Sequence, residues 1–387
     1  MTASLGAVST PRKVEIAITG GCNLDCAYCY FADQMVARND LTTEEWLKFF
    51  AQLGELGVME VTLTGGEVFT RRDIFTLIDG LIENRMRYRL VSNGTMITEK
   101  TIEEFGVGKR RLRLDSVQIS VDGSSSEIHD LSRPKSYKRA IRGLRLLKEA
   151  GFPTLVRVTI NRYNVDDLEN IARLLLEEVG LDSFDTNEAY PCGATSRYED
   201  GIRLTPEQRK QVMNTLLKLN EQYNGRINAQ AGPLFFANAF KQIDAAFASG
   251  TCGSAPGGGK LSACGGVFEQ MAVLHDGTIV PCMVVNSLPI GNIKTDDFAA
   301  VWRDHETMNL MRRRRDIPLG ELETCKGCKY QSYCRGGCPG GAVALGLGLE
   351  ARNPYDCFRV LRGEDTSIQL DGYEKVDVGL IQPWQIK

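Results

Sequence analysis

The sequence predicts an α/β fold, a partial (β/α)6 TIM-like barrel followed by a smaller cysteine-rich domain at the C-terminus. Short runs of β-forming residues alternate with longer stretches of helical periodicity from Val14 to about residue 190, which is the pattern of successive βα units. Around Gly250 the composition changes to Gly, Ser, Ala and Pro, as in a domain boundary. Eleven of the twelve cysteines lie in two groups, one before residue 30 and one after residue 250.

Six parallel strands are expected, at residues 14–19, 60–64, 88–92, 116–120, 155–160 and 183–188. Thr42 resembles a helix N-cap, and Gly151 and Gly180 occupy helix C-cap positions. Residues 136–150 and 165–179 carry apolar side chains at three- and four-residue spacing, so each predicted helix should pack one face on the sheet. In such barrels the loops at the carboxyl ends of the strands carry the active site.

We divide the chain into four parts. The barrel covers residues 1–204, a helical bridge 205–249, the cysteine-rich domain 250–362 and a tail 363–387. The bridge is predicted from two amphipathic stretches, 206–224 and 234–248.

The composition excludes some classes of protein. The net charge of −3 means that the chain lacks the overall positive charge that is typical of proteins that bind nucleic acid. No apolar segment at the start and no uninterrupted apolar run of about 18 residues is present, so neither export nor membrane spanning is indicated. We therefore expect a cytoplasmic protein, and in the reducing cytosol its cysteines are better explained by metal than by disulfides.

The first cysteine group is a C-x3-C-x2-C loop, Cys22, Cys26 and Cys29, directly after the first predicted strand. Three thiolates can hold three irons of a [4Fe-4S] cluster and leave the fourth iron without a protein ligand. A zinc site is the alternative, but a complete one needs a fourth ligand at short spacing, and the nearest histidine is His129.

This loop resembles the signature of the radical S-adenosylmethionine (SAM) enzymes. The resemblance implies that SAM chelates the open iron and that Tyr28 lies beside the adenine. Gly65-Gly66-Glu67, after the second predicted strand, is similar to the family's GGE motif for the SAM amino group, although Val68 stands where the family often has proline.

Polar tips follow the next two predicted strands, and the resemblance implies that they meet the ribose and carboxylate of SAM. Their residues are Ser92, Asn93, Ser120 and Asp122. The alternative is ordinary turn chemistry, since Asn-Gly and Asp-Gly favour turns on their own. Arg133 is the candidate for the methionyl carboxylate, because a guanidinium binds a carboxylate in bidentate fashion; a surface ion pair is the alternative. His129 is expected to be structural.

The second cysteine group resembles the SPASM extension, which holds auxiliary iron-sulfur clusters. Cys264 is followed by Gly277 and Cys282, then by the C-x2-C-x5-C-x3-C run from Cys325 to Cys338. The resemblance assigns auxiliary cluster I to Cys252, Cys264, Cys282 and Cys338, and auxiliary cluster II to Cys325, Cys328, Cys334 and Cys357. Cys252 lies outside the core spacing, and without it cluster I has an iron that substrate could ligate. A zinc ribbon is the alternative.

Residues 275–282 predict a β-hairpin with an Asp-Gly turn that brings Cys282 to the end of a strand. Cys192, at the end of the sixth predicted strand, is outside both groups. It either donates a hydrogen atom to a substrate radical, as an epimerase needs, or lines the pocket as a small side chain. The basic run Arg312–Arg315 is interpreted as a solvated face or as a contact for an acidic leader peptide.

The resemblance implies an enzyme in which a reduced [4Fe-4S] cluster cleaves SAM to a 5′-deoxyadenosyl radical, which abstracts a hydrogen atom from a ribosomally made peptide. We predict a peptide maturase that installs a carbon-carbon or carbon-heteroatom cross-link. Rivals are a peptide epimerase, an anaerobic sulfatase maturase that forms formylglycine, and an electron carrier whose clusters only relay charge.

The cofactors expected are three [4Fe-4S] clusters and SAM. The expected partners are a peptide or protein substrate, above all a leader-bearing precursor peptide, and an electron donor such as flavodoxin or ferredoxin. Since only thirteen residues precede the first predicted strand, we expect leader recognition by a separate protein or by the barrel surface itself.

Overall fold

The computed structural model describes residues 8–35, 39–190, 192–196, 201–250, 254 and 258–364, and its strands form one sheet in the order β10-β9-β8-β1-β2-β3-β4-β5-β6-β7. Neighbours from β1 to β6 pair in parallel. All six predicted strands are present and the predicted α/β arrangement is confirmed. They are β1 Lys13–Thr19, β2 Glu60–Gly65, β3 Arg87–Ser92, β4 Leu114–Ser120, β5 Thr154–Ile160 and β6 Phe184–Glu188.

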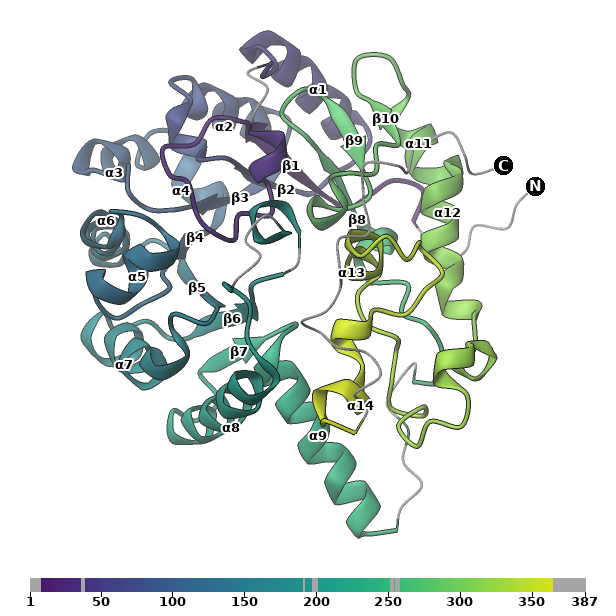
Figure 1. Cartoon of the computed structure of the whole chain (residues 1–387). Coiled ribbons are helices and arrows are strands. Elements are labelled where there is room, and N and C mark those ends of the chain that lie inside the picture. Colours follow the sequence, from purple (N-terminus) through teal and green to yellow (C-terminus); the bar gives the residue numbers. More distant parts are fainter. Residues whose placement is uncertain are drawn as a thin grey trace.

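Helices lie outside this curved sheet, and the strands line its inner side (Figure 1). The first eight helices are α1 Thr43–Glu55, α2 Ile74–Glu83, α3 Glu99–Phe105, α4 Arg110–Arg113, α5 Ser126–Ser132, α6 Tyr137–Glu149, α7 Leu168–Arg173 and α8 Pro206–Gln222. The stretch predicted as one helix over 165–179 is divided into a 3-10 turn, Val165–Asp167, then α7, then a π-helical turn, Leu174–Glu178.

The ends of the helices follow the predicted signals. Thr42 caps α1 in a reciprocal capping box with Glu45. Gly151 and Gly180 have φ of +69° and +74°, the left-handed conformation that glycine adopts most easily after a helix.

One hydrophobic core joins the sheet to the helices. Alternate strand residues such as Ile16, Leu63 and Leu90 are fully buried against the helical layer, which contributes Trp46 and Leu144. Burial of each such side chain stabilises the fold by roughly 1.5–3 kcal/mol. The intervening residues of each strand, such as Glu15, Thr62 and Arg89, point to the opposite face of the sheet.

The sheet is four strands longer, among the described residues, than predicted. The additional strands are β7 Ile227–Ala229, β8 Gln270–Val273, β9 Thr278–Val280 and β10 Gly291–Asn292. β8 pairs in parallel with β1, from Lys13 opposite Gln270 to Ile16 opposite Val273. The C-terminal half therefore continues the sheet of the barrel. Strands of two to four residues are too short to show a period in the sequence.

The predicted hairpin is formed by β8 and β9. The side chain of Asp276 accepts a hydrogen bond from the Thr278 amide, and Gly277 has φ of +90°. Cys282 follows two residues after the end of β9.

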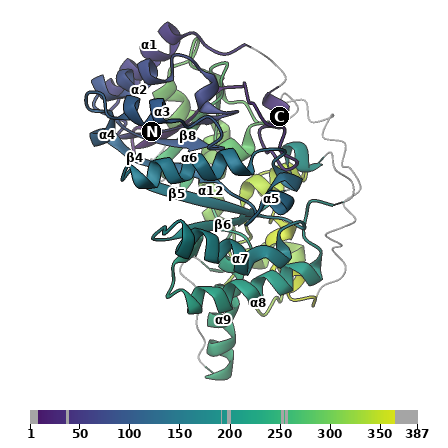
Figure 2. The same cartoon turned by 90° about the vertical axis from the view of Figure 1, so that its left-hand side faces the viewer.

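Apart from α9, the helices that follow β7 are short and are joined by long connections. These helices are α9 Pro233–Ala248, α10 Gly266–Glu269, α11 Phe298–Asp304, α12 Glu306–Arg313, α13 Pro339–Ala344 and α14 Phe358–Leu361. α9, the longest of them, projects from the lower edge of the molecule (Figure 2). The predicted boundary near Gly250 is followed by residues 251–253 and 255–257, which are outside the described ranges.

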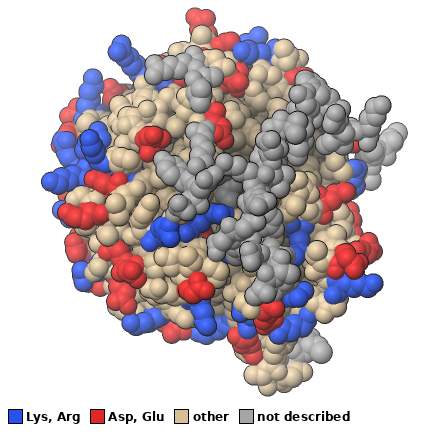
Figure 3. All heavy atoms as spheres, in the orientation of Figure 1, with Lys and Arg blue, Asp and Glu red and all other residues tan. Residues whose placement is uncertain are grey.

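Both signs of charge are interspersed over the face shown in Figure 3, as the small net charge suggests. Within the described ranges, no helix has both the length and the apolar composition that are needed to cross a bilayer.

Candidate functional site

The three cysteines of the first group lie on the loop that follows β1. Backbone hydrogen bonds hold it, from Cys29 N to Cys26 O at 3.1 Å and from Ala27 N to Ser132 O at 3.0 Å. Burial raises the pKa of Cys22 to about 11 and, reinforced by Cys26 and Cys22, that of Cys29 to about 12. The three sulfurs are therefore close enough to influence one another. They are thiols at neutral pH until a metal displaces their protons, which is the donor set that an iron-sulfur cluster takes.

The Gly65-Gly66-Glu67 turn packs directly against this cysteine loop. Gly66 N donates to Thr19 O at 2.9 Å, and Glu67 N donates to Gly21 O at 2.8 Å. A Cβ on Gly66 would lie 2.1 Å from the Gly21 carbonyl oxygen, so only glycine allows this approach.

The Glu67 side chain joins the turn to the end of β3. Its fully buried carboxylate accepts hydrogen bonds from Ser92 Oγ at 2.8 Å, Asn93 N at 2.7 Å and Phe69 N at 3.2 Å. Asn93 Nδ2 in turn donates to Asn23 Oδ1 of the cysteine loop at 2.8 Å. The structure thus brings the predicted residues of two motifs, 65–67 and 92–93, against the first cysteine group.

Asp122 is the centre of a second buried network, at the end of β4. Its carboxylate accepts from Arg133 Nε at 2.5 Å, from Thr159 N at 2.7 Å and from the Tyr28 hydroxyl. The Arg133 guanidinium lies 5.2 Å from the centre of the Tyr28 ring, and its Nη1 is 3.8 Å from Cys26 Sγ. The predicted contact of Tyr28 with adenine and that of Arg133 with a SAM carboxylate stay predictions.

The alternative of a surface ion pair at Arg133 is wrong, because the side chains of Arg133 and Asp122 are 11% and 0% exposed. Ser120 is the last residue of β4 and is partly buried.

His129 is hydrogen-bonded to the backbone of Asp122 and so supports this network. Its Nδ1 accepts a hydrogen bond from Asp122 N at 3.1 Å, and its Nε2 lies 2.9 Å from Ser136 Oγ. The ring is fully buried, and burial lowers its pKa to about 4, so it is neutral at pH 7. These contacts agree with the structural role that we expect.

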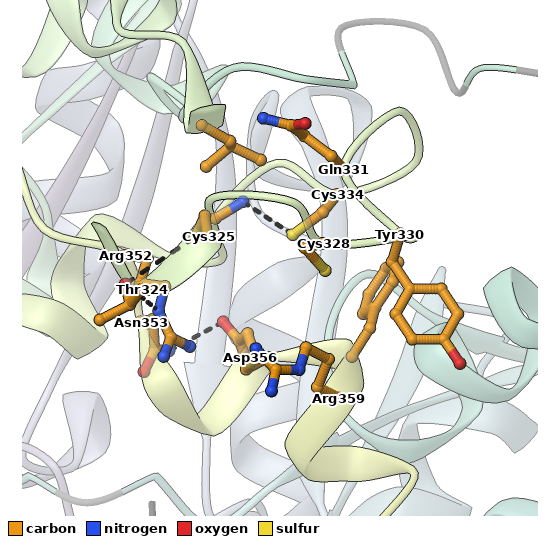
Figure 4. A pocket seen from close by; sticks show the side chains of 14 residues that line it. Thr324, Cys325, Cys328, Tyr330, Gln331, Cys334, Arg352, Asn353, Asp356 and Arg359 are labelled. Atoms are coloured by element: carbon orange, nitrogen blue, oxygen red, sulfur yellow. Dashed lines mark hydrogen bonds between the residues drawn. The ribbon is translucent and has the colours of Figure 1, made fainter. Parts of the chain in front are cut away.

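Four cysteines of the second group surround one cavity. Cys325, Cys328, Cys334 and Cys357 line it together with Arg352, and Figure 4 shows three of the cysteines on one loop over the helical segment that carries Asp356. Burial raises the pKa of Cys334 to about 12, and Cys357, Cys325 and Cys328 raise it further. Arg352 Nη1 is buried and has no hydrogen-bond partner among the described residues. A ring of thiols with an unpaired cation fits an anionic metal cluster.

Three further cysteines of the second group, Cys264, Cys282 and Cys338, are near enough to influence one another electrostatically. Burial raises the pKa of Cys282 to about 12, and Cys338 and Cys264 are among the groups that raise it further. These are three of the four cysteines predicted for auxiliary cluster I, and the fourth, Cys252, is outside the described residues.

The interpretation of Arg312–Arg315 as a solvated or leader-binding face is wrong for two of its residues. Arg312 and Arg314 are 2% and 0% exposed. Arg312 lies 4.5 Å from the Trp302 ring centre and donates to Val267 O at 3.0 Å. The run alternates between exposed and buried side chains, which charge counting could not reveal.

Cys192 is located between the two cysteine groups. Burial raises its pKa to about 12, and Cys29, Asp33 and Cys338 raise it further. Ala194 N donates to Cys29 O at 2.9 Å, and a Cβ on Gly193 would lie 2.4 Å from that oxygen. The loop after β6 is thus packed on the first cysteine loop, and Cys192 is a protonated thiol at pH 7.

Arg314 and Arg352 were not predicted as site residues. The only signal for Arg314 was its place in the basic run, and Arg352 stands in a stretch without a motif.

Among the described residues, no three or more His, Cys, Asp or Glu side chains are grouped as ligands of a single metal ion.

Comparison with known proteins agrees with this geometry. Residues 16–175 match the family model of the radical SAM superfamily, and residues 264–329 match that of SPASM, an iron-sulfur cluster-binding domain.

Two curated relatives and one solved structure align along most of the chain. An AdoMet-dependent heme synthase from Methanosarcina barkeri is 25% identical over 91% of this chain and 97% of its own length. A PqqA peptide cyclase from Rhizobium meliloti is 23% identical over 92% of this chain and 89% of its own length. The crystal structure of Streptococcus suis SuiB bound to the precursor peptide SuiA has a TM-score of 0.68 at 18% identity and covers 92% of this chain and 77% of SuiB.

The two family models together span the cysteine loop, the glycine turn and four of the eight cysteines of the second group, and the solved structure has the same fold. The chain therefore belongs to the radical SAM superfamily, as an enzyme with a SPASM iron-sulfur cluster-binding domain in its C-terminal half.

Proposed function

We propose that this enzyme is a peptide maturase that oxidatively installs a carbon-carbon or carbon-heteroatom cross-link in a ribosomally made precursor peptide. The observation that carries the proposal is the arrangement of cysteines. One group of three lies beside the glycine turn, and two further groups lie in the C-terminal half, one of them around a single cavity. Similarity to a peptide cyclase along 92% of the chain supports the substrate class.

Three [4Fe-4S] clusters are proposed, on the residues predicted for them. When bound, the first cluster and SAM would supply the radical that removes a hydrogen atom from the peptide. The chain's own residues position the motifs around the first cysteine loop. Gly66 lets the backbone approach, Glu67 ties the turn to β3, and Asp122 fixes Arg133 and Tyr28 beside Cys26.

An electron donor such as flavodoxin or ferredoxin, a separate leader-recognition protein and a location in the cytoplasm belong to the same proposal. The electron donor is included because the first cluster must be reduced before it can cleave SAM.

Heme formation is the second candidate. The heme synthase relative aligns over 97% of its own length, which is as extensive as the match to the peptide cyclase. A neutral Cys192 thiol between the cysteine groups also keeps a peptide epimerase open, because a thiol can give a hydrogen atom to a carbon radical.

The test is tandem mass spectrometry after anaerobic incubation of the reconstituted enzyme with reductant, SAM and candidate peptides encoded beside its gene, in deuterated water. Parallel reactions contain a heme precursor in place of peptide. Loss of two hydrogens from a peptide, with fragments missing between two residues, is expected for the cross-link. The variant Cys22→Ala, Cys26→Ala, Cys29→Ala is the inactive control.

Each other outcome favours a different candidate. Gain of one deuterium without oxidation, abolished by Cys192→Ala, would establish an epimerase. Heme formation with unchanged peptides would move the assignment to the second candidate. Formylglycine in the product would identify a sulfatase maturase, and a reduced protein that never cleaves SAM would be an electron carrier.

A further inference from the structure

An arginine that is fully or largely buried lies beside the cysteines predicted for each of the three clusters. Arg133 Nη1 is 3.8 Å from Cys26 Sγ. Arg352 lines the cavity that is surrounded by Cys325, Cys328, Cys334 and Cys357. Arg314 is fully buried, and its guanidinium donates a hydrogen bond to the carbonyl oxygen of Ser262, two residues before Cys264.

The contacts of Arg352 leave part of its guanidinium unsatisfied. Its Nε donates to Thr324 Oγ1 at 2.9 Å, one residue before Cys325. Its Nη1 has no hydrogen-bond partner among the described residues, although the residue is only 9% exposed. Figure 4 shows Arg352 and Thr324 at the edge of the cavity that the cysteine loop borders.

Arg314 has a similar arrangement at the other cysteine group. Its Nε donates to Ser262 O at 2.7 Å, and Ser262 Oγ accepts the Cys264 amide at 3.1 Å. Its Nη1 donates to the carbonyl oxygens of Leu349 and Ala351, and its Nη2 has no partner among the described residues. Burial lowers its pKa to about 10, while Cys338, Cys264 and the exposed Glu350 act in the opposite direction.

A buried cation is costly unless a negative group compensates it. Arg133 has such a group, because Asp122 forms an ion pair with it. Arg314 and Arg352 form no ion pair within the described ranges, and each has a buried N–H group without a hydrogen-bond partner there. Thiolates on a bound cluster would provide the negative charge that both sites lack.

We propose that Arg314 and Arg352 are the charge partners of auxiliary clusters I and II, and that each raises the reduction potential of the cluster that it faces. The inference rests on the cluster assignment in the proposed function. A fixed positive charge and N–H donors near the sulfurs favour the reduced form, which carries one more negative charge. Both arginines therefore make the auxiliary clusters better acceptors for an electron that leaves the substrate.

The experiment is a potentiometric titration followed by electron paramagnetic resonance. The full-length chain carries Cys22→Ala, Cys26→Ala and Cys29→Ala, so that only the auxiliary clusters report. Arg314→Met and Arg352→Met are compared with Arg313→Met, an exposed neighbour of Arg314 that serves as the matched control. Arg314→Lys and Arg352→Lys keep the charge, and iron is counted in every variant.

We expect Arg314→Met to shift one midpoint potential to a more negative value and Arg352→Met to shift the other, with smaller shifts for the lysine variants and none for Arg313→Met. Unchanged midpoints in Met variants with full iron would overturn the inference. So would loss of the same cluster from both the Met and the Lys variant, because that result indicates only a structural role. Absence of auxiliary iron from the triple alanine variant with both arginines intact would overturn the cluster assignment itself. This result distinguishes failure of the proposed function from failure of the inference about the arginines.

Discussion

The two cysteine regions of this enzyme are built in different ways. In the N-terminal region, three cysteines lie within eight residues, directly after a strand of a large, mostly parallel sheet, and protein side chains satisfy the charges around them. In the C-terminal region, the described cysteines are spread from Cys264 to Cys357 over short helices and turns. Small clusters such as Leu345, Tyr355 and Val360 provide its apolar contacts.

The pairing of the buried arginines shows the same difference. Arg133 has Asp122 as its counter-ion, whereas Arg314 and Arg352 each have an N–H without a partner among the described residues. The barrel thus completes its site with its own residues, and the C-terminal lobe depends on what its cysteines bind. Metal binding to such a lobe is coupled to its folding.

Removal of iron should therefore have the largest effect, and should affect the two regions unequally. After anaerobic chelation we expect amide hydrogen exchange of residues 319–361 to accelerate by about a hundredfold or more, because the binding free energy of a structural metal is of order 10 kcal/mol. Strands β2 to β5 should change by less than about tenfold, because their core contains no cysteine.

Two cysteine variants are the controls for this experiment. Cys325→Ala with Cys357→Ala should reproduce the loss in the C-terminal lobe while iron remains at the first loop. The triple alanine variant at Cys22, Cys26 and Cys29 should stop SAM cleavage and leave the lobe protected. Equal loss of protection in β2 to β5 and in the lobe would refute the contrast.

Glu67→Gln tests whether protein contacts alone hold the N-terminal site. The amide of glutamine can replace one carboxylate oxygen but not both, so one of the donors Ser92 Oγ and Asn93 N loses its partner. We expect a loss of about 1–3 kcal/mol in the unfolding free energy of the chelated, metal-free protein. Glu44→Gln, at an exposed position on α1, should change it by less than about 0.5 kcal/mol. An equally small change in both variants would mean that the bound cluster, and not this network, positions the turn.

How much of the structure could be predicted from the sequence also differs between the two regions. The six long strands and the motifs of the first loop could be predicted, because periodicity and spacing are local. The pairing of β8 with β1 could not, since Lys13 and Gln270 are far apart in the chain and a four-residue strand carries no period. Spacing named the seven described cysteines of the second region, but it could not show that Arg314 turns inward while Arg313 remains exposed.

The smallest expected effect is a pH dependence from His129, which supports the N-terminal site without touching its cysteines. Burial lowers its pKa from 6.5 to about 4, so only the unfolded chain takes up a proton between these values. The contribution of His129 to the unfolding free energy is thus complete above about pH 6.5. It is lost as the pH falls, and the unfolding free energy drops by roughly 1 kcal/mol between about pH 7.5 and 5.5. His129→Asn retains an acceptor for the Asp122 amide but cannot titrate. Urea unfolding of both metal-free proteins at the two pH values isolates the contribution of His129 to the unfolding free energy, because His275 and His305 are common to both proteins. A variant that loses stability as steeply as the natural chain would show that His129 is protonated in the folded state, and that the support behind Asp122 is weaker than its burial implies.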